Sequence, residues 1–269
     1  MNRAVFDRFR SLVYQSSGIS LNDTKEALVS ARVAKRMRAL GMSDYGAYLQ
    51  RVEEDRDGTE IVHLIDAIST NVTSFFREPA HFELLSSLVT RWADEGQKRF
   101  RFWSAASSTG EEPYTMAMTL LEAARGRSPL DMRILATDIS TTVLQKCREG
   151  AYSADKLNGV PPQYRERYFD LRKDPRGSPA YVAKDCMKNL LSFQRLNLSQ
   201  PPFPMRGPLD VVFCRNVMIY FDNSVRMKLL EEIHRLLKPG GYLMVGHAES
   251  LTGMMSNLKV FRPSVYVKA

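Results

Sequence analysis

A loop of small residues between two predicted elements is the first place where this sequence could hold a ligand. Residues 100–114 pass from an apolar run through Ser-Ala-Ala-Ser-Ser-Thr-Gly to the start of a predicted helix. Small side chains let a ligand approach the backbone, and the first turn of a helix offers N–H groups to polar ligand atoms. Only Gly110 is present where the dinucleotide fingerprint has three glycines, so this loop alone predicts a nucleotide site without specifying the nucleotide.

Two further segments narrow the choice of ligand. Asp138 ends the next apolar run, and a carboxylate at the carboxyl end of a neighbouring strand can accept hydrogen bonds from both ribose hydroxyls. The alternative is that Asp138 caps the helix that opens at Ser140. Residues 236–243, Leu-Leu-Lys-Pro-Gly-Gly-Tyr-Leu, predict a helix end, a turn and a strand. This order of segments is typical of class I methyltransferases and predicts an S-adenosylmethionine site.

The elements that position these residues follow an α/β pattern. The apolar runs FRFWSAA, MRILATD, DVVFCRNV and GYLMVGH alternate with predicted helices over 112–124, 141–149 and 224–237. Such alternation predicts a largely parallel sheet, with a last strand within 261–269 at its edge. The turn-rich stretch KDPRGSP interrupts the rhythm and predicts a small β insertion at about residues 165–193.

The first seventy residues predict helices only, over 5–14, 22–40, 44–54 and 59–69. We therefore expect a helical domain at 1–70, a linker at 71–90 and an α/β domain at 91–269. The second helix has an apolar face and a positive stripe, which is either a docking face or an ordinary solvated face. The stripe consists of Lys25, Arg32, Lys35, Arg36 and Arg38.

Composition excludes several classes of protein. A net charge of +8 permits an acidic partner without choosing one. No apolar run is long enough to span a membrane and no secretory signal is present, so we expect a cytoplasmic protein without membrane insertion. Three scattered cysteines predict no disulfide framework. His63, His81, His234 and His247 lack metal-ligand spacing, so no metal is expected, and His247 alone follows a strand near the expected substrate mouth.

Four segments of the sequence resemble one particular family, and not only class I methyltransferases in general. Residues 71–78 (NVTSFFRE), 103–114 (WSAASSTGEEPY), 136–138 (ATD) and 213–222 (FCRNVMIYFD) resemble motifs of the CheR family of chemoreceptor glutamate methyltransferases. The resemblance spans nearly the whole chain. It implies a class I S-adenosylmethionine methyltransferase fold, which is α/β and Rossmann-like with a mostly parallel sheet and a small β insertion, preceded by an all-α N-terminal domain.

The resemblance also implies an activity and partners. The methyl group of S-adenosylmethionine would pass to glutamate side chains on the cytoplasmic methylation helices of chemoreceptors, leaving S-adenosylhomocysteine. The chain would then work in the cytoplasm at receptor arrays. In some family members the β insertion binds a short receptor C-terminal peptide, and the sequence KDPRGSP leaves that question open here.

Site residues are carried over by position. Asn71, Thr73 and Arg77 would line the cofactor pocket from the linker side. The remaining expected cofactor residues are Gly110, Glu112, Asp138, Asn197, Leu198, Arg215 and Asn216. Arg77, as a fork for a carboxylate, and Tyr220, as an orienting donor near the methyl group, are the expected catalytic residues. Arg32, Lys35, Arg36 and Arg38 become an expected docking face for glutamate-rich helices.

Two other readings remain. A nucleic-acid methyltransferase fits the charge, but the sequence lacks the Asn-Pro-Pro-aromatic motif and has no aromatic residues interleaved with the basic stripe. A catalytically idle module that only binds S-adenosylmethionine would be expected to lack one of Arg77, Asp138, Asn216 or Tyr220, and all four are present.

Overall fold

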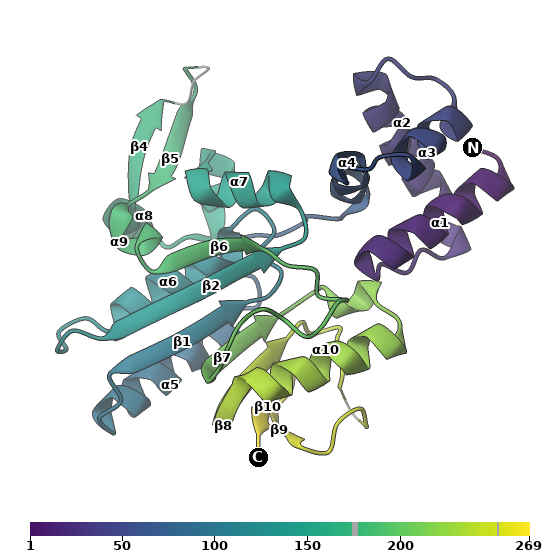
Figure 1. Cartoon of the computed structure of the whole chain (residues 1–269). Helices are drawn as coiled ribbons and strands as arrows, with labels where there is room; N and C mark the ends of the chain where they lie inside the picture. The colour runs from purple at the N-terminus through teal and green to yellow at the C-terminus, as the bar shows by residue number, and fades with distance from the viewer. Residues whose placement is uncertain (174–176, 252) are drawn as a thin grey trace.

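The structure, a computed structural model, describes residues 1–173, 177–251 and 253–269 as a helical N-terminal domain beside an α/β body (Figure 1). The N-terminal helices are α1 (Arg3–Ser17), α2 (Glu26–Ala39), α3 (Tyr45–Glu53) and α4 (Thr59–Ile68), with a 3-10 turn η1 (Asp23–Lys25) before α2. The predicted single helix over 22–40 is therefore split, and the Asn22 side chain makes no capping hydrogen bond.

Local sequence explains the bounds of α1. The Asn2 side chain accepts a hydrogen bond from the Val5 backbone N–H at the start, and Gly18 ends the helix in the left-handed conformation at φ 72°. Phe6, Phe9 and Val13 recur at helical spacing and are fully buried. They join apolar side chains of α2, α3 and α4 in a core that is separate from the core of the α/β body.

A seven-stranded sheet in the order β6-β2-β1-β7-β8-β10-β9 forms the α/β body. Its strands are β1 (Arg99–Ser104), β2 (Asp131–Asp138), β6 (Leu191–Arg195), β7 (Leu209–Cys214), β8 (Leu237–Val245), β9 (Leu258–Arg262) and β10 (Val265–Lys268). The five strands from β6 to β8 run parallel, and β10 is antiparallel to both neighbours. All six residues of β7 are buried, as expected of a strand covered on both faces.

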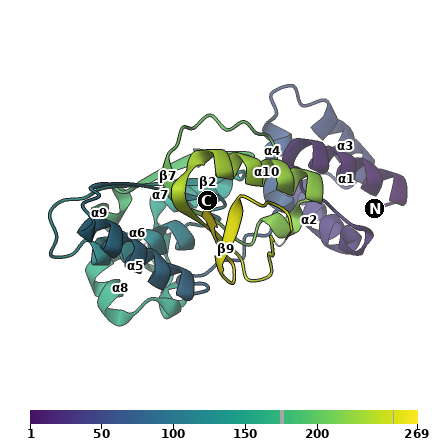
Figure 2. The same ribbon diagram turned by 90° about the horizontal axis from the view of Figure 1, so that it is seen from below.

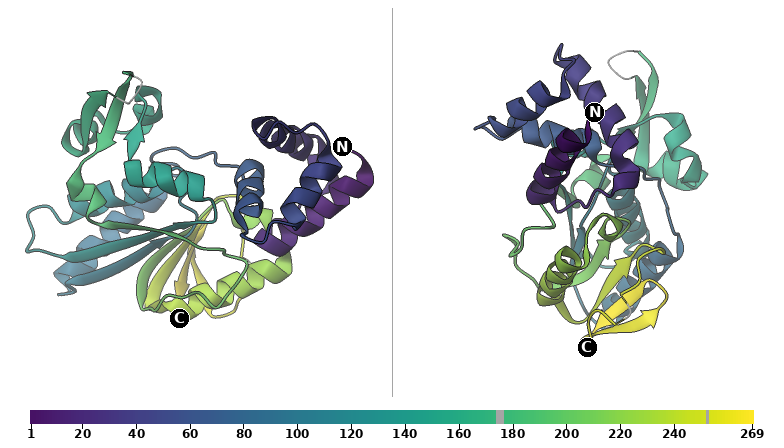
Figure 3. Two further views of the ribbon diagram at one scale, coloured as in Figure 1. Left: turned by 45° about the horizontal axis from the view of Figure 1, so that its top comes forward. Right: turned by 90° about the vertical axis from the view of Figure 1, so that its right-hand side faces the viewer.

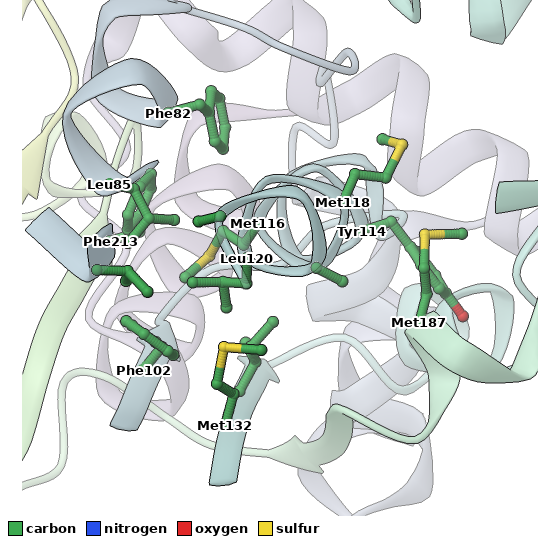
Figure 4. Packing of buried hydrophobic residues seen from close by; sticks show 14 of the residues in the cluster. Phe82, Leu85, Phe102, Tyr114, Met116, Met118, Leu120, Met132, Met187 and Phe213 are labelled. Carbon is green, nitrogen blue, oxygen red and sulfur yellow. The ribbon is translucent and has the colours of Figure 1, made fainter. Parts of the chain in front are cut away.

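Helices cover both faces of the sheet. Side chains of α5 (Ala80–Asp94) and α6 (Glu111–Ala123) pack against β1, β2 and β7 on one face, where Phe102, Met116 and Phe213 lie close together (Figure 4). Helix α10 (Asn223–Leu236) covers β7 and β8 on the other face, and it lies in front of the sheet in the view from below in Figure 2. Helix α7 (Thr141–Glu149) packs against β2 and β6.

A second, antiparallel sheet forms the β subdomain, in the order β3-β5-β4. Its elements are β3 (Ala151–Tyr152), η2 (Ala154–Gly159), α8 (Pro162–Tyr168), β4 (Phe169–Lys173), β5 (Pro179–Ala183) and α9 (Asp185–Lys188). Figure 3 shows this subdomain and the N-terminal helices as separate projections from the body. Residues 174–176 of the turn KDPRGSP lie outside the described residues. Whether this turn binds a receptor peptide is therefore as open as it was from the sequence.

Four expectations about element bounds need correction. The β insertion begins at β3 rather than near residue 165, and residues 191–193 belong to β6 of the main sheet. Irregular chain between α4 and α5 covers only 69–79, because α5 starts at Ala80 within the expected linker. The end of the chain forms the hairpin β9–β10 instead of one strand. The described residues contain no helix that is long and apolar enough to cross a membrane.

Candidate functional site

A cavity lies between the N-terminal domain and the carboxyl edge of the parallel strands. Ala105 follows β1, Ile139 follows β2, Leu196 follows β6 and Arg215 follows β7, and all four line it. Chain from η1, α2 and residues 68–74 closes the opposite side. The carboxyl edge of a doubly wound sheet is where this fold class binds ligands, so the cavity is the candidate site. Of the expected cofactor residues, those in the cavity wall are Asn71, Thr73, Arg77, Glu112, Asp138, Asn197, Leu198, Arg215 and Asn216.

Asp138 sits at the end of β2 with its carboxylate turned toward the loop after β1. Its Oδ2 accepts from the Ser108 backbone N–H at 2.9 Å, and its Oδ1 accepts from the Ser140 backbone N–H at 3.0 Å. Burial raises the pKa of Asp138, and these backbone donors partly oppose the rise. Ser140, and not Asp138, caps α7 by accepting from Val143. Asp138 is therefore part of the cavity wall rather than a helix cap.

Glu112 is tied to a buried arginine. Its Oε1 accepts from the Ser104 hydroxyl at 2.7 Å, and its Oε2 lies 3.1 Å from the Arg215 guanidinium. Burial raises the pKa of Glu112 despite that cation. Arg215 also pairs with Glu78 at 3.1 Å and donates to the Arg77 carbonyl. The Arg215 side chain is only 1% exposed, so its charge is balanced inside the protein.

Arg77 and Tyr220 both line the cavity, as expected. One guanidinium nitrogen of Arg77 donates to the Val72 carbonyl at 3.0 Å. Within the described chain Arg77 has no carboxylate within 4.0 Å, in contrast to Arg215. The Lys25 ammonium lies 5.4 Å from the Tyr220 ring centroid. A half-buried arginine with donors to spare can receive a carboxylate that enters the cavity.

Gly110 and Asn197 differ from expectation. Gly110 precedes α6 at φ 100° and does not line the cavity; a Cβ there would lie 2.5 Å from the Tyr152 hydroxyl, so glycine is required by packing. Asn197 lines the cavity, but its amide nitrogen donates to the Ser16 carbonyl at 2.9 Å and its oxygen accepts from Ser199. Its polar atoms connect the two domains and are not directed to a ligand.

The basic face of α2 is only partly available. Arg36 makes two hydrogen bonds to the buried Glu60 carboxylate, at 2.9 and 2.7 Å. Arg32 lines the cavity and donates to the carbonyls of Ile68 and Ser69 at the end of α4. Lys35 and Arg38 are exposed. The sequence could not show this division, because Arg32 and Arg36 contact residues in α4 and at its end, which are distant in the sequence.

Contacts between the two domains border the cavity. The Tyr14 hydroxyl donates to the Asp222 carboxylate at 2.5 Å, and the Ser20 N–H donates to the Tyr220 carbonyl at 2.8 Å. Ile19 forms an isolated β bridge with Phe221. On the other side, the Thr142 hydroxyl donates to Asp66 at 2.6 Å. The loop that carries Tyr220 is therefore attached to the N-terminal domain.

Two histidines lie together, which their spacing in the sequence did not indicate. The rings of His81 and His247 are 5.6 Å apart, and a carboxylate oxygen of Glu78 lies 3.5 Å from Nδ1 of His81 and 3.9 Å from Nε2 of His247. This is a group of possible metal ligands among the described residues, although Arg215 already occupies Glu78. Burial lowers the pKa of His81 to about 4, so its imidazole is neutral at pH 7.

Sequence reasoning missed several residues of the site. Glu78 stands in the segment 71–78 but received no role, although a carboxylate next to Arg77 was visible. Residues from η1 and α2 that line the cavity, such as Lys25 and Val29, carried no local signal, because only the tertiary fold brings them to the sheet edge. Glu249 is buried and accepts backbone hydrogen bonds from the loop after β7.

Comparison with known proteins finds relatives that match nearly the whole chain. The chain is 39% identical to a chemotaxis protein methyltransferase of Salmonella typhimurium over 99% of this chain and 90% of that protein. It is also 39% identical to one from Escherichia coli K12, over 99% and 91% of the two chains. One from Borreliella burgdorferi is 36% identical over 97% and 93%.

Two family models divide the chain between them. The all-alpha domain of CheR methyltransferases matches residues 4–69, and their S-adenosylmethionine-binding domain matches residues 71–267. The second match contains the cavity wall from Asn71 to Tyr220 and the seven-stranded sheet up to the next-to-last residue of β10. The chain therefore belongs to the CheR methyltransferase family and carries its S-adenosylmethionine-binding domain.

Proposed function

We propose that this chain transfers the methyl group of S-adenosylmethionine to specific glutamate side chains of chemotaxis receptors, forming glutamyl methyl esters. Membership in the CheR family and near full-length similarity to chemotaxis protein methyltransferases support the proposal. The structural observation that carries it is Arg77, which lines the cavity without a carboxylate partner among the described residues. A guanidinium in that state suits a substrate whose reacting group is a carboxylate.

The residues of the cavity fit the cofactor. The buried carboxylate of Glu112 can pair with the ammonium of the methionyl part. Burial raises the pKa of Glu112 although Arg215 is near, so a further cation would stabilise the ionised carboxylate. Asp138 at the end of β2 can accept from ribose hydroxyls. The wall also contains the small side chains of Ala105, Ala106 and Ser108, so a ligand can approach the backbone there. Leu198 supplies apolar surface suited to adenine.

The protein's contribution to the reaction is alignment. When bound, S-adenosylmethionine supplies an activated methyl group. A glutamate side chain, with a usual pKa near 4.3, is already ionised at neutral pH, so no general base is needed. Arg77 orients the incoming carboxylate and Tyr220 forms part of the wall beside it. Holding the carboxylate oxygen in line and excluding water from it lowers the barrier through positioning.

The exposed cations of α2 suit the receptor surface. Lys35 and Arg38 face solvent on α2, while Arg32 of the same helix and Lys25 of the preceding turn η1 line the cavity. A glutamate-rich receptor helix that crosses this face would meet positive charge before its target side chain reaches Arg77. We propose this pair as the docking residues, with action in the cytoplasm at receptor arrays.

The experiment is transfer of radiolabelled methyl groups to receptor-containing membranes. Arg77→Ala should lower the rate roughly 100-fold while retaining the fold, and Arg91→Ala, an exposed arginine on α5, should not. The label should be released by mild base and should be absent from a receptor whose target glutamates are alanines. Base-stable label, or label on RNA, would leave the cofactor site in place and overturn the proposed substrate.

A further inference from the structure

The loop after β7 carries much of the cavity wall but has little regular structure of its own. Arg215, Asn216, Val217 and Tyr220 line the cavity from residues 215–221, where a 3-10 turn η3 (Met218–Tyr220) is the only element. Asn216 has φ 57°, in the left-handed region that is uncommon for residues other than glycine. Something outside the loop must hold its backbone in this conformation.

Glu249 makes the contacts that could do so. Its Oε2 accepts from the backbone N–H of Asn216 at 2.7 Å and from that of Gly246 at 2.7 Å. Its Oε1 accepts from the backbone N–H of Ile219 at 3.2 Å. The residue is 3% exposed and does not line the cavity. A carboxylate only accepts hydrogen bonds, and three backbone donors from two loops converge on this one.

Gly246 completes the arrangement at the end of β8. A Cβ on Gly246 would lie 2.3 Å from Asn216 Nδ2 and 2.8 Å from Glu249 Oε2. Both distances are shorter than real Cβ atoms accept, so a Cβ at residue 246 would displace the side chain of Asn216 or Glu249. The Glu249 N–H also donates to the Gly246 carbonyl at 2.8 Å, which closes the turn 246–249 on itself.

We propose that Glu249 is a positioning residue for the methyl-transfer site. By binding the backbone of Asn216 and Ile219, it fixes the loop that presents Arg215, Asn216 and Tyr220 to the cavity. It acts through that loop and touches neither cofactor nor substrate. The proposal rests on the cofactor assignment, and its activity readout rests on the proposed function.

The first test is Glu249→Gln. The amide oxygen can still accept from Asn216 and Gly246, but the amide nitrogen then faces the Ile219 N–H, so one hydrogen bond becomes a contact between two donors. We expect the affinity for S-adenosylhomocysteine, measured by calorimetry, to fall about tenfold. The kcat for methyl transfer should fall as well, with the receptor KM changed less than about twofold, because α2 is untouched.

A matched control is Glu232→Gln. Glu232 is also a buried carboxylate, 6% exposed, and accepts from the Phe203 backbone N–H at 2.7 Å. It lies on α10 and does not line the cavity. This variant should lose stability comparable to that lost by Glu249→Gln, yet retain the affinity for S-adenosylhomocysteine within about twofold.

A second variant, Gly246→Ala, keeps the carboxylate and displaces Asn216 from the other side. It should also weaken S-adenosylhomocysteine binding while circular dichroism stays unchanged. The proposal is overturned if both variants bind S-adenosylhomocysteine as the wild type does, or if Glu232→Gln weakens binding equally. Binding of S-adenosylhomocysteine needs no receptor. A loss of affinity in both variants, together with a wild type that does not methylate receptors, would therefore sustain this inference and reject the proposed function.

Discussion

Glu112 shows how a single buried charge can be held ready for a ligand. One arginine and one hydroxyl contact it, and burial still raises its pKa above the ordinary value of a glutamate. Removing the charge should therefore weaken cofactor binding without opening the fold. We expect Glu112→Gln to lower the affinity for S-adenosylmethionine at pH 7.5 by about tenfold or more, measured by calorimetry.

The same carboxylate should make binding depend on pH. Because pairing with the cofactor ammonium needs ionised Glu112, affinity should fall as pH decreases through its raised pKa. In Glu112→Gln this dependence should shrink, and the remainder belongs to Asp138, whose pKa burial also raises. A variant with the wild-type affinity and pH profile would mean that Glu112 does not contact the ammonium.

His81 gives a prediction about stability. Burial and then the nearby Arg215 lower its pKa from 6.5 to about 4, whereas the unfolded chain takes up the proton near 6.5. Because the folded pKa is the lower one, stability is lost as pH falls from 6.5 toward 4. Between pH 7.5 and pH 5, wild type should lose about 2 kcal/mol more than His81→Gln in urea unfolding. His247→Gln, at an exposed neighbour, should lose as much as wild type.

The positions of some site residues could be predicted before the fold was known. Asp138 was placed at the site because it ends a parallel strand, and Glu112 and Arg215 were placed there by the family resemblance; all three line the cavity. The contacts of Asn197 and Gly110 could not be predicted, because the neighbours concerned, Ser16 and Tyr152, are distant in the sequence. Those partners become visible only when the chain is folded.

Helix α2 divides its cations between folding and surface charge. Arg36 bonds Glu60, whose side chain is 8% exposed; burial alone would raise the pKa of Glu60, but the hydrogen bonds from Arg36 and Tyr48 outweigh it and the pKa is lowered. Arg36→Ala should leave Glu60 buried with only Tyr48 as a side-chain partner. We expect a loss of roughly 3 kcal/mol in the free energy of unfolding. Arg38→Ala should stay within about 0.5 kcal/mol of wild type.

The exposed cations of α2 should show the opposite behaviour. Lys35→Glu with Arg38→Glu should leave thermal stability nearly unchanged and keep the affinity for S-adenosylhomocysteine. The receptor KM should rise roughly tenfold, more so at low salt, because two attractive charges become repulsive. If KM is unchanged across a salt series, the receptor docks elsewhere on the molecule.

Among elements, those with strong periodicity were predicted and those with mixed exposure were not. The runs that became β1, β2, β7 and β8 each end in at least three consecutive buried residues. Strand β6 has no fully buried residue and lies at the sheet edge, so its sequence gives no apolar run. Helix α5 begins directly after Pro79, a start signal that the expected linker at 71–90 obscured.

Over the whole molecule, the cavity exists only where two separately built domains meet. Each has its own apolar core, and the cavity wall draws residues from both. Hydrogen bonds join them, such as those of Tyr14 with Asp222 and of Asn197 with Ser16. Cofactor affinity should therefore depend on how the two domains fit together, although the packing of each core does not.

Two glycines allow that dependence to be tested. Gly18 and Gly41 both lie at helix ends in the left-handed conformation, at φ 72° and 69°. A Cβ on Gly18 would lie 2.4 Å from the Ser199 Cβ of the other domain, whereas a Cβ on Gly41 would meet nothing within 4 Å. Each alanine variant should cost roughly 1 kcal/mol of stability through backbone strain.

Only Gly18→Ala should also push the domains apart. We expect its affinity for S-adenosylhomocysteine to fall about fivefold or more, while Gly41→Ala stays within about twofold of wild type. Calorimetry at a temperature where both variants are folded measures the two affinities. Because the backbone strain is common to both variants, a difference in affinity reports the contact between the domains. Equal affinities would mean that the cavity tolerates displacement of the N-terminal domain and that the α/β body alone determines cofactor binding.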